Sequence, residues 1–151
     1  MQKVLAVASG GGHWKELMLL RDGFDFENIN QVKYITTIAG LPEEEGIQDF
    51  VIIKDSNKTQ KLALVVSFFQ ILAVYLRYRP DLVISTGAAA GIVSVIIGKI
   101  FRAETIWIDS IANADKLSLS GDIARWLADT VLTQWAHLAN GKKVQFHGSV
   151  F

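Results

Sequence analysis

The sequence of 151 residues contains no cysteine, which excludes disulfides and thiolate-bound zinc and fits a cytoplasmic location. Neither sign of charge is in excess, because the sequence contains 15 basic and 15 acidic residues. This balance argues against a nucleic-acid binder that relies on overall basicity. The histidines His13, His137 and His147 lack the spacing of metal ligands, so we expect neither a metal nor another cofactor.

Short apolar runs rich in branched residues alternate with helical stretches along the chain. Most of these runs are continuous, as in strands that are covered on both faces. The alternation predicts one α/β domain over residues 1–151, a parallel sheet with helices on both faces. The predicted strands are Lys3–Ala8, Gln31–Thr37, Phe50–Ile53, Asp81–Ser85, Glu104–Asp109, Thr130–Gln134 and Val144–His147, and the predicted helices are His13–Arg21, Thr59–Arg79, Ala89–Phe101 and Ser120–Asp129.

A glycine loop follows the first predicted strand and opens the first helix. It consists of Ser9, Gly10, Gly11 and Gly12. Glycine leaves room for a ligand at the backbone, and free N–H groups at a helix start attract a phosphate or diphosphate. A P-loop and a dinucleotide fingerprint both fail here, because Lys15 is in the wrong place for the first and replaces a glycine of the second. The alternative is a tight turn that binds no ligand.

His13 follows this loop and falls in the first turn of the helix. A histidine beside a bound phosphate can act as a general base or donate a hydrogen bond to it. The alternative is a helix-start histidine that packs against Trp14.

Two further loops follow predicted strands and are expected at the same edge of the sheet. Thr86 and Gly87 follow the strand before an alanine-rich helix, and Asp109 ends the next strand with Ser110 directly after it. We expect Thr86, Gly87 and Ser110 to bind the ligand and Asp109 to contribute a carboxylate to the chemistry. The alternatives are close helix–sheet packing for the second loop and a helix cap for Asp109.

The segment Lys61–Arg79 is apolar around most of its circumference. We expect the face with Leu62, Val65 and Phe69 to pack on the sheet, which leaves a second apolar face for a membrane or a partner protein. Cations flank the segment and suit an anionic membrane surface; they are Lys54, Lys58, Lys61, Arg77 and Arg79. The alternative is a buried core helix or a subunit interface. The residues expected to make the membrane or partner contact are Leu64, Phe68, Ile71, Tyr75, Arg77 and Arg79.

Several motifs in their order along the chain resemble the acceptor-binding half of GT-B glycosyltransferases. They are "SGGGHW", "PDLVISTGAAAG", "WIDSIANADKLSLSG", "TQW" and "VQFHGSVF". The sequence is most similar to split enzymes in which that half is a separate, membrane-associated subunit. These include the UDP-GlcNAc transferase of N-glycan assembly and bacterial exopolysaccharide and capsule proteins. The N-terminal half of the peptidoglycan GlcNAc transferase is also similar.

The resemblance implies a Rossmann-like fold and a peripheral location on the cytoplasmic face of the membrane. It implies a polyprenyl-diphosphate-linked saccharide as acceptor, and a nucleotide sugar shared with a donor-binding partner subunit. By motif, Ser9–Gly12 would meet the acceptor diphosphate or the reaction centre, and His13 would deprotonate the acceptor hydroxyl. Asp109 would lie near the acceptor sugar, as a second candidate base or as the orienting partner of His13. A non-catalytic scaffold that recruits a transferase to the membrane is the alternative function.

Overall fold

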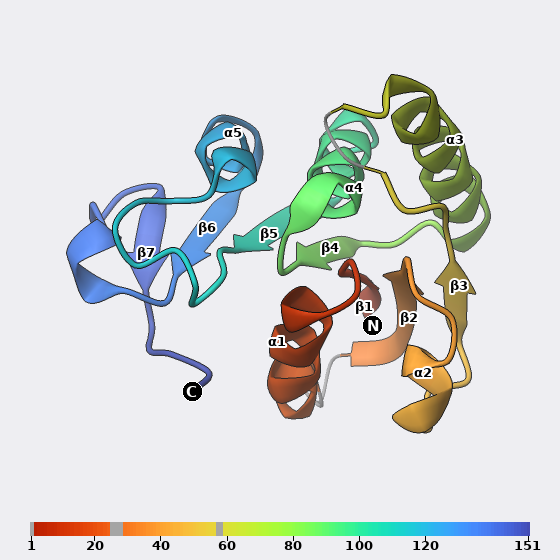
Figure 1. Cartoon of the computed structure of the whole chain (residues 1–151), viewed down its shortest axis with the longest axis horizontal. Helices are drawn as coiled ribbons and strands as arrows, with labels where there is room; N and C mark the ends of the chain where they lie inside the picture. The colour runs from red at the N-terminus through yellow and green to blue at the C-terminus, as the bar shows by residue number, and fades with distance from the viewer. Residues whose placement is uncertain (1, 25–28, 57–58) are drawn as a thin grey trace.

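The computed structural model describes residues 2–24, 29–56 and 59–151, in which helices cover both faces of one sheet (Figure 1). Lys58, one of the predicted flanking cations, lies outside the described residues. In order, the helices and strands are β1 (Gln2–Val7), α1 (Gly12–Leu20), η1 (Arg21–Phe24), β2 (Ile29–Thr36), α2 (Leu41–Glu44), β3 (Phe50–Ile52), α3 (Lys61–Tyr78), β4 (Leu82–Ser85), α4 (Ala88–Ile100), β5 (Glu104–Ile108), α5 (Leu119–Leu127), β6 (Thr130–Thr133), η2 (Ala136–Leu138) and β7 (Val144–Phe146).

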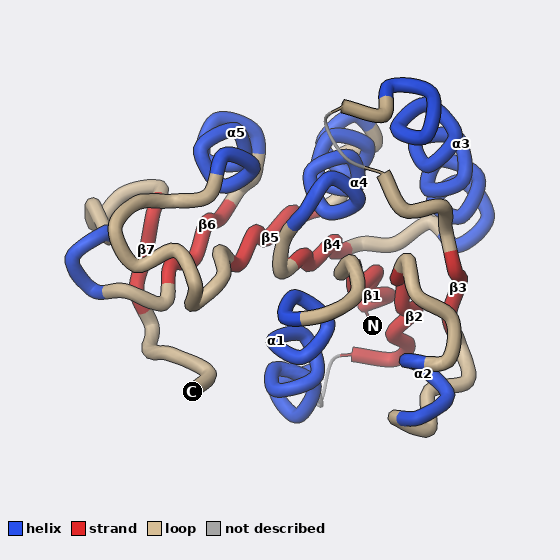
Figure 2. The backbone as a smooth tube through the Cα atoms, viewed as in Figure 1, coloured by secondary structure: helices blue, strands red, loops and turns tan. Residues whose placement is uncertain are grey.

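The described part of the chain forms a sheet of seven parallel strands in the order β3-β2-β1-β4-β5-β6-β7. Helices α3, α4 and α5 lie on one face of the sheet and α1 and α2 on the other (Figures 1 and 2). The predicted fold class is therefore confirmed, and the predicted strands and longer helices agree with the structure within two residues at each end. The short helix α2 was not predicted.

Strand β1 shows why the apolar runs are continuous. Val4 and Ala6 belong to the core cluster around Trp14 of α1. Leu5 and Val7 point to the opposite face, into the cluster beneath α3 and α4. Because successive strand residues point to opposite faces, a central strand covered on both sides needs apolar residues at every position.

Helix α3 packs on the sheet with the opposite face from the one predicted. Ile71 is 0% exposed and Tyr75 is 4% exposed, while Leu64 and Phe68 pack against the same core cluster. The prediction that Ile71 and Tyr75 contact a membrane or partner is therefore wrong. Both faces of the helix are apolar with the same period, so the sequence could not tell which face packs on the sheet. Ser67 lies on the inner face, where it is buried and donates a hydrogen bond to the Leu64 carbonyl.

The outward face of α3 is consequently the one that had been expected to pack on the sheet. Leu62 is 78% exposed, Phe69 61% and Leu76 50%. Arg77 and Arg79 are exposed at the end of the helix. By length and composition α3 is apolar enough to cross a membrane, but its inner face belongs to the core of the fold.

The strand order places a switch point between β1 and β4, where successive strands begin to add on the other side. In doubly wound sheets ligands bind at this point, beyond the carboxyl ends of the strands. The loops that leave β1, β4 and β5 all start at that edge and lead into α1, α4 and α5. The candidate site lies between these loops.

At the opposite edge of the sheet, Asp129 ties the start of β6 to β5. Its carboxylate accepts hydrogen bonds from the backbone N–H and the hydroxyl of Thr105, both at 2.9 Å, and pairs with Lys99. Burial by itself raises the pKa of this carboxyl, but the bonds from Lys99 and Thr105 outweigh it and hold the pKa below its ordinary value of 3.8.

Because the pKa of Asp129 is lower in the folded protein than in the unfolded chain, its carboxylate stabilises the fold at pH values above the pKa of the unfolded chain. This stabilisation is lost as the pH falls through the pKa of the folded protein. We expect Asp129→Asn to flatten the acid part of the stability profile, measured by urea unfolding at a series of pH values. Asp55→Asn, which changes an exposed carboxylate, should keep the wild-type profile. Identical acid profiles for Asp129→Asn and wild type would contradict this assignment.

Candidate functional site

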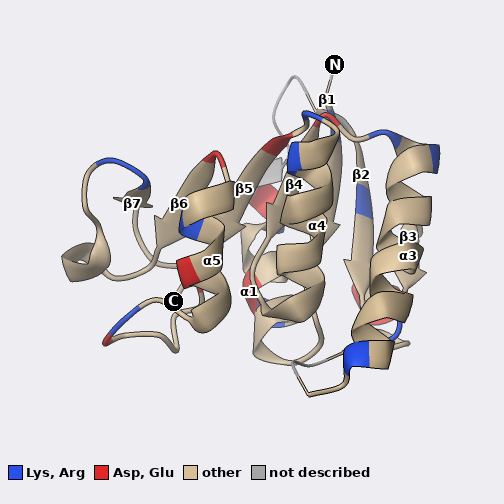
Figure 3. Ribbon diagram, turned by 90° about the horizontal axis from the view of Figure 1, so that it is seen from above, with Lys and Arg blue, Asp and Glu red and all other residues tan. Residues whose placement is uncertain are grey.

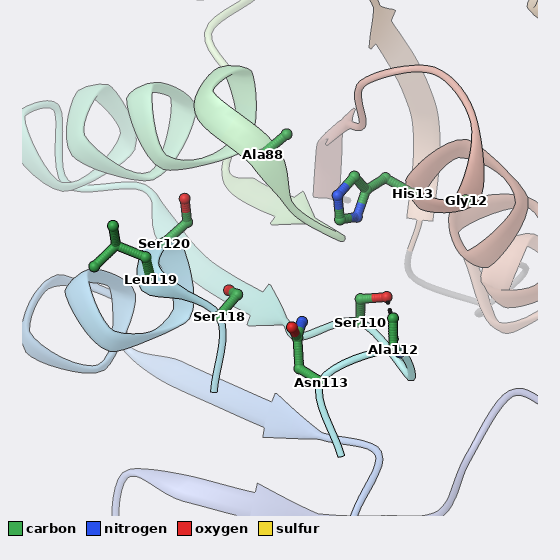
Figure 4. A pocket seen from close by; sticks show the side chains of 9 residues that line it. All are labelled: Gly12, His13, Ala88, Ser110, Ala112, Asn113, Ser118, Leu119 and Ser120. Atoms are coloured by element: carbon green, nitrogen blue, oxygen red, sulfur yellow. Dashed lines mark hydrogen bonds between the residues drawn. The ribbon is translucent and has the colours of Figure 1, made fainter. Parts of the chain in front are cut away.

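A cavity of about 450 Å³ lies at the edge of the sheet where the strands end (Figure 4). The starts of α1, α4 and α5 and the loop between β5 and α5 form its wall. None of the described lining residues carries an Asp, Glu, Lys or Arg side chain. The lining residues are Gly12, His13, Ala88, Ser110, Ala112, Asn113, Ser118, Leu119 and Ser120.

Helix N-termini supply the electrostatic character of this cavity. Helices α1 and α4 begin after Gly11 and Gly87, neither of which offers a capping side chain. The first N–H groups of a helix have no acceptor within the helix and carry the positive end of its dipole. Several such ends around one space favour an anion with several oxygen atoms, such as a diphosphate.

The ring of His13 is fixed by contacts with the loop after β4. Its Nδ1 lies 2.9 Å from the Thr86 carbonyl oxygen, which can only accept, so Nδ1 carries the proton. The neutral ring then keeps a lone pair on Nε2. The Thr86 hydroxyl in turn donates to the His13 carbonyl at 2.7 Å. His13 thus projects into the cavity (Figure 4), while Trp14 packs in the core beside Tyr34.

Gly87 lies directly against the His13 ring. A Cβ at this position would come within 2.5 Å of two ring atoms, and the φ of +142° is unfavourable for other residues. The next residue, Ala88, also has a positive φ of 66°, which is rare outside glycine and costs backbone strain. No sequence pattern had indicated Ala88, because alanine at a helix start is ordinary.

The first glycine loop is divided between structural and cavity positions. Gly10 donates to the Thr37 hydroxyl at 3.2 Å, and a Cβ on it would lie 2.0 Å from Ile38. Gly12 lines the cavity, and a Cβ on it would meet no atom within 4 Å. A side chain at Gly10 would therefore require Ile38 to move, whereas Gly12 leaves the α1 N-terminus accessible to a ligand. Ser9 and Gly11 lie in the same loop but do not line the cavity.

Asp109 is buried behind the cavity wall, which corrects its predicted role. It is 2% exposed and is not a lining residue. Its carboxylate accepts hydrogen bonds from the Ser118 hydroxyl at 2.6 Å, the Ser118 N–H at 2.8 Å and the Trp107 indole at 3.1 Å. The described partner of His13 Nδ1 is Thr86, not Asp109. Asp109 therefore positions Ser118, whose hydroxyl caps α5 by accepting from Gly121.

A second buried carboxylate, Glu16, was missed by sequence reasoning. It is 2% exposed, and its Oε1 accepts from the Ser110 hydroxyl and the Ile111 N–H, both at 2.9 Å. Its Oε2 has no hydrogen-bond partner among the described residues. Glu16 thereby joins α1 to the loop that carries Ser110 into the cavity. The signal available was an acidic residue between Trp14 and Leu17 on the core side of α1.

Of the predicted ligand-binding residues, the structure brings Gly12, His13 and Ser110 into one lining, with Thr86 and Gly87 supporting the His13 ring. Within residues 2–24, 29–56 and 59–151, no group of three or more His, Asp or Glu side chains is arranged to hold a metal ion.

The fold is shared with several solved structures. Acinetobacter baumannii MurG matches with a TM-score of 0.79 over 97% of this chain and 45% of that chain, at 11% identity. The UDP complex of Staphylococcus aureus MnaA matches with a TM-score of 0.75 over 99% of this chain and 44% of that chain, at 12% identity. The UDP-N-acetylglucosamine 2-epimerase of Rickettsia bellii matches with a TM-score of 0.74 over 99% of this chain and 45% of that chain, at 15% identity. The chain spans less than half the length of these proteins.

These likenesses define the class of the fold, which is the Rossmann-like N-terminal half of GT-B enzymes such as MurG. The model of the family described as "Oligosaccharide biosynthesis protein Alg14 like" matches residues 47–150. The chain therefore belongs to the Alg14-like family, and the resemblance drawn from the sequence motifs is confirmed. No curated protein matches the sequence significantly.

The role given to Asp109 can be tested by Asp109→Asn. The amide keeps one acceptor oxygen but turns an NH₂ group toward buried donors, so we expect the free energy of unfolding to fall by roughly 2–4 kcal/mol. Urea unfolding at neutral pH measures the change, with Asp115→Asn at an exposed position of the same loop as control. If Asp109→Asn were as stable as the control, Asp109 would not position α5.

Proposed function

We propose that this chain is the acceptor-binding subunit of a two-component glycosyltransferase in polysaccharide biosynthesis, of the exopolysaccharide or capsule type. The transferred sugar comes from a nucleotide diphosphate sugar, and the acceptor is a saccharide linked to polyprenyl diphosphate. The observation that carries this proposal is the cavity at the helix N-termini with His13 fixed in its wall. Membership of the Alg14-like family supports it.

The helix N-termini bind the acceptor diphosphate in this proposal. The first N–H groups of α1 and α4 donate to its oxygen atoms, and the partial positive charge of the helix ends offsets its negative charge. Ser120 lines the same cavity, and its hydroxyl is available to the acceptor saccharide. Ser110 also lines the cavity, with its hydroxyl donated to Glu16. Glu16 and Asp109 fix the loop and the helix cap around this space.

His13 acts as the general base. Its Nε2 takes the proton of the acceptor hydroxyl while that oxygen attacks the anomeric carbon of the donor sugar. The bond from the anomeric carbon to the nucleoside diphosphate breaks, and the diphosphate leaves with the bonding electron pair. The Thr86 carbonyl accepts a hydrogen bond from Nδ1 and stabilises the positive charge that develops on the ring. A donor-binding partner subunit holds the nucleotide sugar and stabilises the leaving diphosphate.

The base is tested by reconstitution of the chain with its donor-binding partner, vesicles, a polyprenyl-diphosphate saccharide and labelled nucleotide sugar. We expect His13→Ala to lower the rate of transfer 10²–10⁴-fold, the usual contribution of a general base. His137→Ala, at an exposed histidine outside the cavity, should transfer at the wild-type rate. Transfer by His13→Ala at the wild-type rate would favour the non-catalytic scaffold instead.

We further propose that the outward face of α3 lies on the cytoplasmic surface of a membrane. This face combines Leu62, Val65, Phe69 and Leu76, all at least half exposed. Charged residues occur only near the ends of α3, at Lys61 and Arg77 (Figure 3). An apolar stripe with cations at its ends suits the boundary between acyl chains and anionic headgroups. Because the inner face is core, the helix would lie along the surface.

Removal of this apolar face should release the protein from membranes. We expect the double variant Leu62→Ser, Phe69→Ser to lose about tenfold or more in affinity for vesicles containing anionic lipid, measured by co-sedimentation. Leu19→Ser removes a side chain that is 50% exposed on α1, on the opposite side of the sheet, and should bind like wild type. Equal binding by the double variant would show that α3 does not contact the membrane.

A further inference from the structure

Helix α5 carries an apolar stripe that the fold does not use. Leu119 is 56% exposed, Ile123 42% and Trp126 75%. Their spacing at i, i+4 and i+7 places them along one side of the helix. The core side of the same helix is formed by Gly121 and Ala124. A short surface helix ordinarily turns polar side chains outward, so this stripe requires an explanation other than packing.

The stripe is continuous with the candidate site. Leu119 is its first residue and also lines the cavity at the helix N-termini. Seven residues further on, the stripe ends at Trp126, where Arg125 lies 5.5 Å from the indole ring centre. Helical rise gives the stripe a length of about 10 Å. It therefore leads from the mouth of the cavity across the surface of the protein.

We infer that this stripe, Leu119, Ile123 and Trp126, is a track for the first isoprene units of the lipid that carries the acceptor. The inference rests on the proposed function. A prenyl diphosphate joins an anionic group directly to an apolar chain, and the chain must leave the cavity once the diphosphate binds at the helix ends. Leu119 offers an apolar exit, and Ile123 and Trp126 continue it.

The shape of the stripe favours a single chain over a broad protein interface. Asp122 and Arg125 flank it on one side, where their side chains form an ion pair at 3.5 Å. This ion pair bounds the stripe on that side with polar groups. Its place at the cavity mouth also separates it from the outward face of α3, which contributes no residue to the cavity lining given above.

Calorimetric titration of the full chain with prenyl diphosphates below their micellar concentrations tests this track. Dimethylallyl diphosphate reaches the cavity alone, whereas farnesyl diphosphate extends along the stripe. We expect farnesyl diphosphate to bind about tenfold more tightly, because apolar surface leaves water. In the double variant Ile123→Ser, Trp126→Gln, the ratio of the two dissociation constants should fall to about one. Neither residue lines the cavity.

The matched control is Leu62→Ser, Phe69→Ser, which removes similarly exposed apolar side chains from α3 and should keep the tenfold ratio. An unchanged ratio in the α5 variant, or an equal loss in the α3 control, would overturn the track. If the wild-type protein binds both diphosphates equally tightly, the track is wrong but the diphosphate site is supported. The stripe would then contact another protein or the bilayer instead of the prenyl chain. If neither diphosphate binds, the proposed function fails together with the track.

Discussion

The parallel direction of the described strands is the constraint on which the candidate site depends. It brings the ends of β1, β4 and β5 to one edge, so that α1, α4 and α5 all begin there. At the switch point between β1 and β4, the ring of His13 rests on the backbone of Gly87. The positive helix ends and the histidine therefore share one cavity, although they come from distant parts of the sequence.

Two buried carboxylates behind the cavity wall hold the helix starts and loops of the site in place. Asp109 fixes the start of α5 through Ser118, and Glu16 ties α1 to the loop that carries Ser110. A buried carboxylate is costly unless hydrogen bonds satisfy it, and Asp109 accepts such bonds at both oxygens. The strained φ of Ala88 belongs to the same wall. Preorganised helix ends and a fixed ring are what a site for charge stabilisation requires.

Much of this architecture could be predicted from the sequence. The continuous apolar runs and their alternation with helices predicted the strands and the parallel sheet. The position of the loops directly after the strands predicted that Gly12, His13 and Ser110 lie close together. The outward face of α3 could not be predicted, because both faces are apolar and the buried Ser67 satisfies its hydroxyl locally. The positioning role of Asp109 depends on Ser118, nine residues away, and that contact leaves no periodic pattern in the sequence.

The central claim is that backbone N–H groups at converging helix N-termini bind a diphosphate. The amide NMR spectrum of the full chain, recorded during titration with inorganic diphosphate, tests it most directly. The account predicts that the amide signals of Gly12, His13 and Ala88 move most, because these residues line the cavity at the helix starts. The amide signals of Ala103 and Gly141, which lie outside the cavity lining, should stay in place. Shifts concentrated away from the cavity, or none at saturating diphosphate, would contradict it.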